Sequence, residues 1–349
     1  MVINSNSSRI NLKVYQKIRG GNMKLTFDQI KALTVGAHDI KQHDNGIISF
    51  FKCTDKQTQA WLDHGNETLC NRSKTTTGIR LDFHTNSKSF AFKTFSTGSF
   101  ELLIDGILRE KYYAPEGEKS IEAKIKLTDS IGNEKDDIRV TLVFPSHAIG
   151  RLEYAEIDDG AYAVSHGYSR KMMFIGDSIT QGAASTRDTF SFAWKLTLHY
   201  NAESIINGIG GAYYEPETFD KVNFDPDTVI LAYGTNDATH FRLFEDMERR
   251  VIGYFDLVKE HYGDKRVVVI SPIWRGDADM KPMGAEFDRR RKMIEREADA
   301  RGFEVISGLE LVPPRAEFFA DKYLHPSDLG YGVYAVNLIK KLDENENRR

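Results

Sequence analysis

Four segments that follow predicted strands carry side chains that could do chemistry together. They read Gly176-Asp177-Ser178-Ile179-Thr180, Asn207-Gly208-Ile209-Gly210-Gly211, Gly234-Thr235-Asn236-Asp237 and Asp321-Lys322-Tyr323-Leu324-His325-Pro326. The carboxyl ends of parallel strands meet at one edge of a sheet, where reactive groups collect. A serine hydroxyl within reach of an imidazole is the starting point of nucleophilic catalysis, because the ring takes the hydroxyl proton during attack.

Taken singly, each segment has an ordinary structural interpretation. A serine after a strand is commonly a helix N-cap, and a glycine-rich turn is commonly only a tight turn. The turn at Gly208 lacks the third glycine of a dinucleotide-binding fingerprint, because Tyr213 stands there, so that function is excluded. The combination of the four segments, and not any one of them, points to a function.

The order Ser178, Gly211, Asn236, His325 resembles the SGNH subgroup of GDSL-type esterases and lipases, with Gly-Asp-Ser-Ile-Thr and Gly-Thr-Asn-Asp as the specific strings. The resemblance implies that Ser178 is the nucleophile and His325 the general base. It further implies an oxyanion hole made by the Ser178 and Gly211 N–H groups and the Asn236 amide, although the turn could instead present Gly210. The α/β-hydrolase elbow is absent, because Thr180 stands where its second glycine belongs.

The implied chemistry is acyl-ester hydrolysis through an acyl-enzyme. Histidine suits the base because its pKa lies near working pH. Amide donors bind the negative charge that develops on the carbonyl oxygen. This chemistry requires no metal ion and no organic cofactor, and we expect none.

The third member of the triad is an open question. In the family an acid usually stands three residues before the histidine, where this chain has Lys322. Asp321 stands four residues before His325 and would reach the ring if the loop bulges. The alternative is a Ser–His dyad in which a backbone carbonyl orients the ring. We favour Asp321.

Substrate contacts are less clearly indicated. Tyr213, Tyr214 and Trp274 follow predicted strand ends and could offer aromatic faces to sugar rings, and His240 follows Asn236 closely. Packing in the core or at the rim is an equally good interpretation of the aromatic residues, and a solvent-facing loop is one for His240. A long Leu-rich lid is missing, which disfavours a lipase for long chains.

Strands and helices alternate from about residue 170 onward. This alternation predicts a three-layer, flavodoxin-like α/β domain with a parallel sheet. The predicted strands cover 171–175, 204–206, 228–232, 266–270 and 303–306, and the predicted helices cover 189–200, 244–262, 285–301 and 328–342.

The preceding part is strand-like, with short segments at 47–51, 78–83, 89–93, 100–104, 121–125 and 138–143. Regular turns and no long helical pattern predict an all-β sandwich or jelly roll. We therefore expect a leader over 1–22, a jelly-roll accessory domain over 23–167 and a catalytic domain over 168–349. This order resembles family 2 carbohydrate esterases. The accessory domain could bind sugar, cover the cleft or build a homo-oligomer.

The amino-acid composition limits the class of protein that this chain can be. The 349 residues are 40% hydrophobic and 28% charged with a net charge of −4, which is typical of a soluble globular protein and disfavours nucleic-acid binding. Membrane spans are not expected, because no apolar run reaches about 20 residues. Cys53 and Cys70 cannot build a disulfide scaffold. The polar leader lacks a signal-like apolar stretch, so we expect a cytoplasmic protein. Arg19-Gly20-Gly21, just before Met23, can be encoded by a purine-rich string that resembles a bacterial ribosome-binding site, so we expect Met23 to be the natural start.

These observations predict a serine esterase that removes acyl groups, above all O-acetyl groups, from a sugar or short oligosaccharide. Two alternatives stay open. One is a lysophospholipase or thioesterase of the same fold, and the other is a carbohydrate-binding protein that has lost catalysis.

Overall fold

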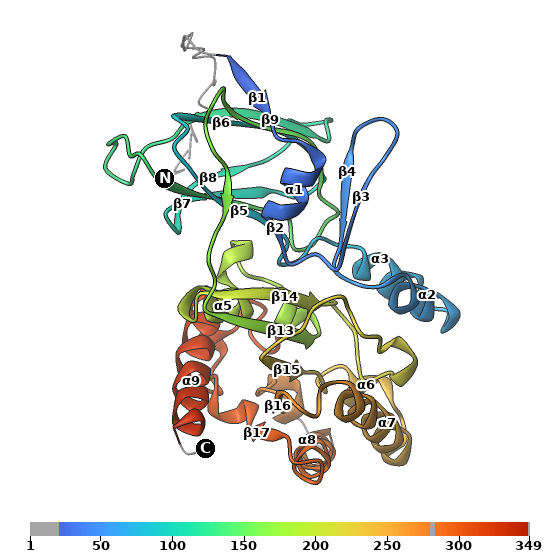
Figure 1. Ribbon diagram of the computed structural model, residues 1–349. Helices are drawn as coiled ribbons and strands as arrows, with labels where there is room; N and C mark the ends of the chain where they lie inside the picture. Colours follow the sequence, from blue (N-terminus) through green and yellow to red (C-terminus); the bar gives the residue numbers. More distant parts are fainter. Residues whose placement is uncertain (1–20, 280–282, 348–349) are drawn as a thin grey trace, which may run out of the picture.

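The computed structural model describes residues 21–279 and 283–347 as two packed parts, a β-rich part and an α/β part (Figure 1). The predicted leader, residues 1–22, lies outside the described residues except for Gly21 and Asn22. Among the described residues, no helix is both long and apolar enough to cross a membrane.

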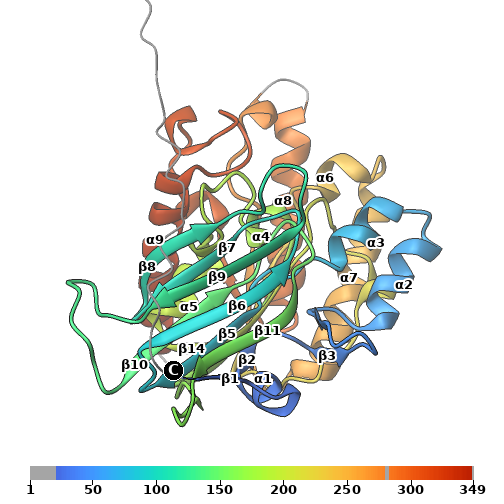
Figure 2. The ribbon, with the colours of Figure 1, turned by 90° about the horizontal axis from the view of Figure 1, so that it is seen from above.

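The N-terminal part is a sandwich of two antiparallel six-stranded sheets (Figure 2). One sheet has the order β3 (Asp39–Gln42), β4 (Ile48–Phe51), β11 (Arg151–Asp158), β6 (Ser89–Phe95), β9 (Ser120–Lys126), with β1 (Asn22–Lys24) on β11. The other has the order β12 (Val164–Ser165), β5 (Arg80–Thr85), β10 (Ile138–Val143), β7 (Phe100–Ile104), β8 (Ile107–Tyr112), with β2 (Thr34–Val35) on β5. The apolar residues that alternate along these strands, Phe83, Phe90 and Val140 among them, form the core between the sheets. The predicted all-β sandwich is confirmed.

Three short helices in this part were not predicted: α1 (Phe27–Leu33), α2 (Asp55–Asp63) and α3 (Glu67–Ser73). A capping box starts α2, because the Thr54 hydroxyl accepts the Gln57 N–H while the Gln57 side chain accepts the Thr54 N–H. Trp61 on α2 and Leu69 on α3 are buried in a core shared with the α/β part. Helices α2 and α3 therefore join the sandwich to its neighbour, whereas Ile30 and Leu33 of α1 pack into the core of the sandwich.

The C-terminal part contains a five-stranded parallel sheet in the order β14 (Ala202–Gly208), β13 (Arg170–Gly176), β15 (Thr228–Ala232), β16 (Arg266–Ile270), β17 (Glu304–Ile306). In chain order this is 2-1-3-4-5, the flavodoxin-like arrangement. The predicted parallel α/β fold is therefore confirmed.

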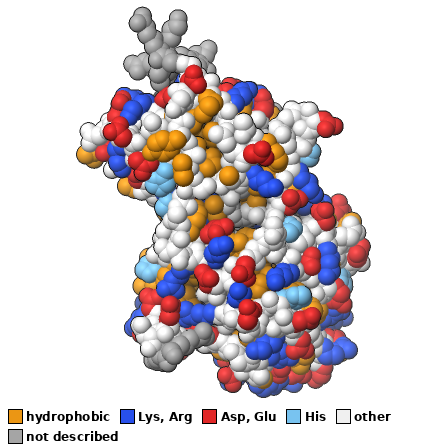
Figure 3. Space-filling model, viewed as in Figure 1, with side chains coloured by type: hydrophobic (Ala, Val, Ile, Leu, Met, Phe, Trp, Pro, Cys, Tyr) orange, Lys and Arg blue, Asp and Glu red, His pale blue; other side chains and the backbone are white. Residues whose placement is uncertain are grey.

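Helices cover both faces of this sheet. Figure 1 shows α5 (Phe192–His199) and α9 (Asp328–Glu346) on one face, with α7 (Phe244–Tyr262) and α8 (Met283–Asp299) on the other. The periodic residues Met247, Val251, Tyr254 and Val258 are all buried, so the stripe on α7 is core, as its spacing predicted. Figure 3 shows cationic and anionic side chains intermixed over the exposed side of this part.

Candidate active site

Ser178 lies at the turn from β13 into a short helix, α4 (Ser178–Gln181). The Asp177 carboxylate caps this helix by accepting the Ile179 N–H at 2.9 Å. Gly176 is required before it, because a Cβ there would stand 2.1 Å from Thr180 Oγ1. The strand therefore ends with the Ser178 hydroxyl at the carboxyl edge of the sheet, where the side chain is 9% exposed.

His325 comes from the loop before α9 and meets Ser178 across 147 residues of sequence. Its Nε2 lies 3.0 Å from Ser178 Oγ, and its Nδ1 lies 2.7 Å from Asp321 Oδ2. A carboxylate only accepts hydrogen bonds, so Nδ1 donates and Nε2 is left to accept the serine proton. The three side chains form one hydrogen-bonded series.

The Asp321 carboxylate is fixed by the backbone of its own loop. It accepts N–H groups from Tyr323 at 3.1 Å, Leu324 at 2.8 Å and His325 at 3.1 Å. Burial raises the pKa of Asp321, but these N–H groups and the His325 ring outweigh it and lower the pKa overall. The carboxylate is thus ionised and oriented beside the ring.

The glycine-rich turn after β14 offers one N–H to the site. The Gly210 N–H donates to Gln181 Oε1 at 2.8 Å, and the Ala212 N–H donates to the Ile209 carbonyl at 2.9 Å. Between them, the Gly211 N–H has no hydrogen-bond partner among the described residues. Gly211 has φ +88°, which a glycine adopts without strain. Of the two candidate donors, Gly211 is therefore the one that stays available.

Asn236 precedes α6 (Asp237–His240), four residues after β15 ends. Its Nδ2 donates to the Ala212 carbonyl at 2.9 Å, which ties this loop to the glycine turn and orients the amide. The second Nδ2 hydrogen and the Ser178 N–H have no partner within the described ranges. These two donors and the Gly211 N–H are the groups that could bind an oxyanion.

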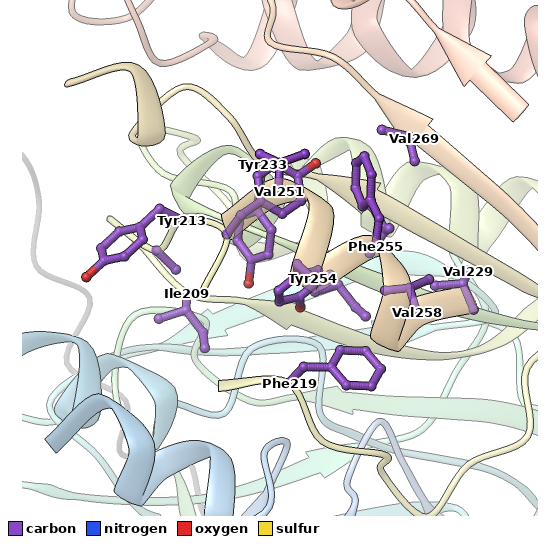
Figure 4. Packing of buried hydrophobic residues seen from close by; sticks show 14 of the residues in the cluster. Ile209, Tyr213, Phe219, Val229, Tyr233, Val251, Tyr254, Phe255, Val258 and Val269 are labelled. Atoms are coloured by element: carbon purple, nitrogen blue, oxygen red, sulfur yellow. The ribbon is translucent and has the colours of Figure 1, made fainter. Parts of the chain in front are cut away.

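Two of the predicted substrate contacts are buried. Tyr214 is 0% exposed and packs edge-on against Tyr233 and Phe255, so its assignment to the substrate was wrong. Its ring turns into the core between the sheet and α7. Tyr213 is 6% exposed and belongs to the buried hydrophobic cluster drawn in Figure 4. Its ring stacks on the exposed His240 ring, with centroids 3.9 Å apart.

Trp274 remains half-exposed next to the histidine loop. Tyr323, a residue that we did not predict, borders Gly276 together with Trp274. A Cβ on Gly276 would be 3.0 Å from Trp274 Cη2 and 3.1 Å from Tyr323 Cβ. Tyr323 is 42% exposed. Its place two residues before His325 was the signal that could have indicated it.

The sandwich also contributes residues to the neighbourhood of the site. The Arg72 guanidinium donates to the Gly210 carbonyl at 2.7 Å, and a fully buried Lys52 donates to the Gly208 carbonyl at 2.8 Å. The pKa of the His147 ring is lowered overall. Burial and the charges of Lys52 and Arg72 lower it, and together they outweigh the hydrogen bond to the Gly182 backbone, which raises it. The sequence has no signal for the contacts of Arg72 and Lys52, which join segments over 130 residues apart.

A separate group of side chains could bind a metal ion. Among the described residues, ligand atoms of His64, Glu215 and Glu217 lie within 4.8 Å of one another. However, Arg250 pairs with both carboxylates, and its Nη1 lies 2.9 Å from Glu217 Oε2. A cation therefore already occupies this cluster, and it contains none of the triad residues.

Known proteins resemble this chain in family and in fold. Residues 174–333 match the model of the GDSL-like Lipase/Acylhydrolase family. No curated protein matches the chain. Among solved structures, the salicylyl-acyltransferase SsfX3 from a tetracycline biosynthetic pathway has a TM-score of 0.78 and 17% identity over 93% of this chain and 98% of that one.

Two further structures are similar over both domains. A putative GDSL-like lipase from Bacteroides ovatus has a TM-score of 0.69 and 17% identity, covering 93% of this chain and 97% of its own. A family two carbohydrate esterase from Clostridium thermocellum, solved with cellohexaose, has a TM-score of 0.63 and 14% identity, covering 90% and 98%.

The family match and the fold define the class of protein, a carboxylic-ester hydrolase of the SGNH type. The resemblance seen in the sequence is confirmed. Within this class, the sandwich followed by a GDSL-like domain is the fold of the family 2 carbohydrate esterases.

Proposed function

We propose that this protein hydrolyses O-acetyl esters of a sugar or short oligosaccharide through an acyl-enzyme on Ser178. The observation that carries the proposal is the hydrogen-bonded series from Ser178 Oγ through His325 to Asp321, with distances of 3.0 and 2.7 Å. Such a series is the working geometry of a serine hydrolase.

In the first half-reaction Ser178 Oγ attacks the ester carbonyl carbon as His325 Nε2 takes the hydroxyl proton. The carbonyl oxygen becomes an oxyanion and accepts hydrogen bonds from the Ser178 and Gly211 N–H groups and the Asn236 amide. The intermediate then expels the sugar alcohol, which receives the proton from His325.

The second half-reaction repeats these steps with water. His325 Nε2 takes a proton from water, the hydroxide attacks the acyl-enzyme, and Ser178 leaves with the proton as acetate is released. Asp321 keeps the ring in the tautomer that accepts at Nε2 and stabilises the imidazolium that forms in each half.

A short acyl group agrees with the surroundings of the Gly208–Gly211 turn. A Cβ on Gly211 would stand 3.0 Å from Arg72 Nη1 and 3.4 Å from Leu69 Cδ2, so these two side chains leave little space beside the turn. A sugar as the alcohol is supported by the partly exposed Trp274 and the exposed Tyr323, and by the carbohydrate esterase with the same two-domain fold.

Acetate release from a panel of acetylated mono- and oligosaccharides tests the proposal. We expect release by the wild-type enzyme and none by Ser178→Ala, with Ser185→Ala as a control on a nearby serine. Release that survives Ser178→Ala would overturn the assignment of the nucleophile. Comparing acetyl with decanoyl p-nitrophenyl esters separates a lysophospholipase or thioesterase, which would prefer the longer chain. A serine inert to fluorophosphonate would favour a carbohydrate-binding protein.

An acyltransferase is the second candidate, because the structure with a TM-score of 0.78 is a salicylyl-acyltransferase. The same acyl-enzyme would then be attacked by an acceptor hydroxyl in place of water. Adding sugar alcohols to the p-nitrophenyl acetate assay separates the two. Transfer would raise p-nitrophenol release and yield acetylated sugar, whereas hydrolysis yields acetate alone.

A further inference from the structure

The turn Gly208–Gly211, called here the donor turn, is bound from the side of the β-sandwich. Arg72 on α3 donates through Nη1 to the Gly210 carbonyl at 2.7 Å. Lys52, between β4 and α2, donates through Nζ to the Gly208 carbonyl at 2.8 Å. Both contacts cross from the N-terminal part to the catalytic part, so the turn depends on two chain segments outside its own domain.

The bond from Arg72 is made to one particular peptide unit. The Gly210 carbonyl and the Gly211 N–H belong to the same peptide, and this N–H is the available donor of the turn. A guanidinium on the carbonyl fixes the plane of that peptide and draws electron density away from its N–H, which makes the N–H a stronger donor. Without this bond, two adjacent glycines leave the peptide free to rotate.

Lys52 is buried in a way that packing alone does not explain. It is 1% exposed, and besides Gly208 it donates to Thr75 Oγ1 at 2.8 Å and Thr77 Oγ1 at 3.0 Å. No carboxylate pairs with it in the part of the chain that the structure describes. An unpaired buried ammonium is costly, whereas an apolar side chain of similar size would fill the space without that cost.

The Gly210 N–H of the donor turn is bound as well. Gln181 accepts the Gly210 N–H at 2.8 Å while its Nε2 donates to the Ser146 carbonyl of the sandwich at 2.7 Å. A Cβ on Gly210 would be 3.7 Å from Ser178 Cβ and 3.8 Å from Arg72 Cδ, so the arginine stem and the nucleophile approach the same point. The turn is thus held on both sides directly beside Ser178.

We propose that Arg72 and Lys52 are positioning residues, which hold the Gly210–Gly211 peptide with its N–H directed at the substrate oxyanion. The sandwich then contributes to catalysis, because its side chains position a donor of the oxyanion hole. This inference rests on the proposed function, because it assumes that an oxyanion forms at Ser178.

The test uses the full-length protein with p-nitrophenyl acetate, with intact sites counted by exhaustive fluorophosphonate labelling. Arg72→Met is the main variant, since the Arg72 side chain is exposed and its loss should not prevent folding. Loss of a whole oxyanion donor costs about 10²–10³ in kcat, so a weakened donor should cost about 10- to 100-fold. We expect KM to stay within about threefold, because the oxyanion exists only after attack.

Arg72→Lys keeps a cationic donor and is expected to recover most of kcat. Lys74→Met, an exposed neighbour, should match the wild-type enzyme. Lys52→Met, compared with the exposed Lys56→Met, should lower kcat in the same way. If Lys52→Met does not fold, as judged by circular dichroism, Arg72→Met decides alone.

Two results would overturn the proposal. One is a wild-type kcat in Arg72→Met per labelled site, while Ser178→Ala is inactive. The other is a fall in which KM rises and kcat does not, since that would assign Arg72 to substrate binding. Activity that survives Ser178→Ala is a different failure, because it overturns the proposed function and this inference together.

Discussion

Asp321 Oδ2 lies 2.7 Å from His325 Nδ1, although four residues separate the two positions in the chain. Lys322 is the extra residue of this loop, and its φ of +73° lets the loop bulge. The carboxylate thereby reaches the ring that an acid three residues away would reach without a bulge.

Asp321→Asn tests whether this contact makes a triad. An amide in place of the carboxylate favours the wrong ring tautomer, and we expect kcat for p-nitrophenyl acetate to fall by about 10⁴. Asp136→Asn, at an exposed position of the sandwich, is the matched control and should be unchanged. A fall below about tenfold would instead support a Ser–His dyad.

The bulge itself is testable at Lys322. A left-handed conformation costs a non-glycine residue about 1 kcal/mol, so Lys322→Gly should raise the free energy of unfolding by up to about 1 kcal/mol and leave kcat unchanged. Lys322→Pro should lower kcat sharply, because proline requires a negative φ and removes the N–H that donates to the Phe319 carbonyl. Urea unfolding and p-nitrophenyl acetate kinetics measure both effects. An unchanged kcat in Lys322→Pro would contradict the role of the bulge.

Asn236→Ala should lower kcat by about 10²–10³ with little change in KM, the cost of one oxyanion donor. The Asn236 amide is oriented by its bond to the Ala212 carbonyl, so alanine removes a preorganised group. The same substitution at the exposed Asn223 is the control. Wild-type turnover in Asn236→Ala would remove this residue from the oxyanion hole.

The sequence predicted the residues that topology brings together. Ser178, Gly211 and Asn236 follow strands β13, β14 and β15, and neighbouring parallel strands carry their ends to one edge. It did not predict Lys52 or Arg72, because their contacts depend on how two domains pack and not on a local pattern.

Two errors have local causes. Tyr214 stands next to Tyr213 after the donor turn, but nothing in the sequence said which way its ring points, and it points into the core. The helix α2 was missed although the Thr54 and Gln57 capping box was visible, because the neighbouring strand-like segments outweighed it.

The contribution of Asp237 to the stability of the protein should fall as pH rises from about 4 to about 7. Burial raises the pKa of Asp237 to about 7 although the Tyr214 N–H opposes this, and its Oδ2 lacks a partner among the described residues. Below pH 4 both folded and unfolded chains hold the proton. As pH rises further, the unfolded chain releases it first and is favoured.

Asp237→Asn should reduce that fall, because an amide does not titrate. A difference of about three pKa units corresponds to at most about 4 kcal/mol. Part of the change of stability with pH should remain in this variant, because burial raises the pKa of Asp177 to about 7 as well. Urea unfolding at pH 4.5 and 7.5 measures the effect, with the exposed Asp264→Asn as control. An equal slope in wild type and Asp237→Asn would contradict the prediction.

Tyr323 tests the proposed sugar surface. This residue is 42% exposed, its Cβ and the Trp274 ring both border Gly276, and it stands two residues before His325, which protonates the leaving alcohol. Aromatic contacts of this kind are worth about 0.5–1.5 kcal/mol, so Tyr323→Ala should raise KM for an acetylated oligosaccharide by about two- to tenfold. The KM for p-nitrophenyl acetate, which has no sugar to bind, should not change. Tyr113→Ala, which removes a 65% exposed ring from the sandwich, should change neither value. An equal rise in KM for both esters would show that Tyr323 supports the histidine loop and does not bind sugar.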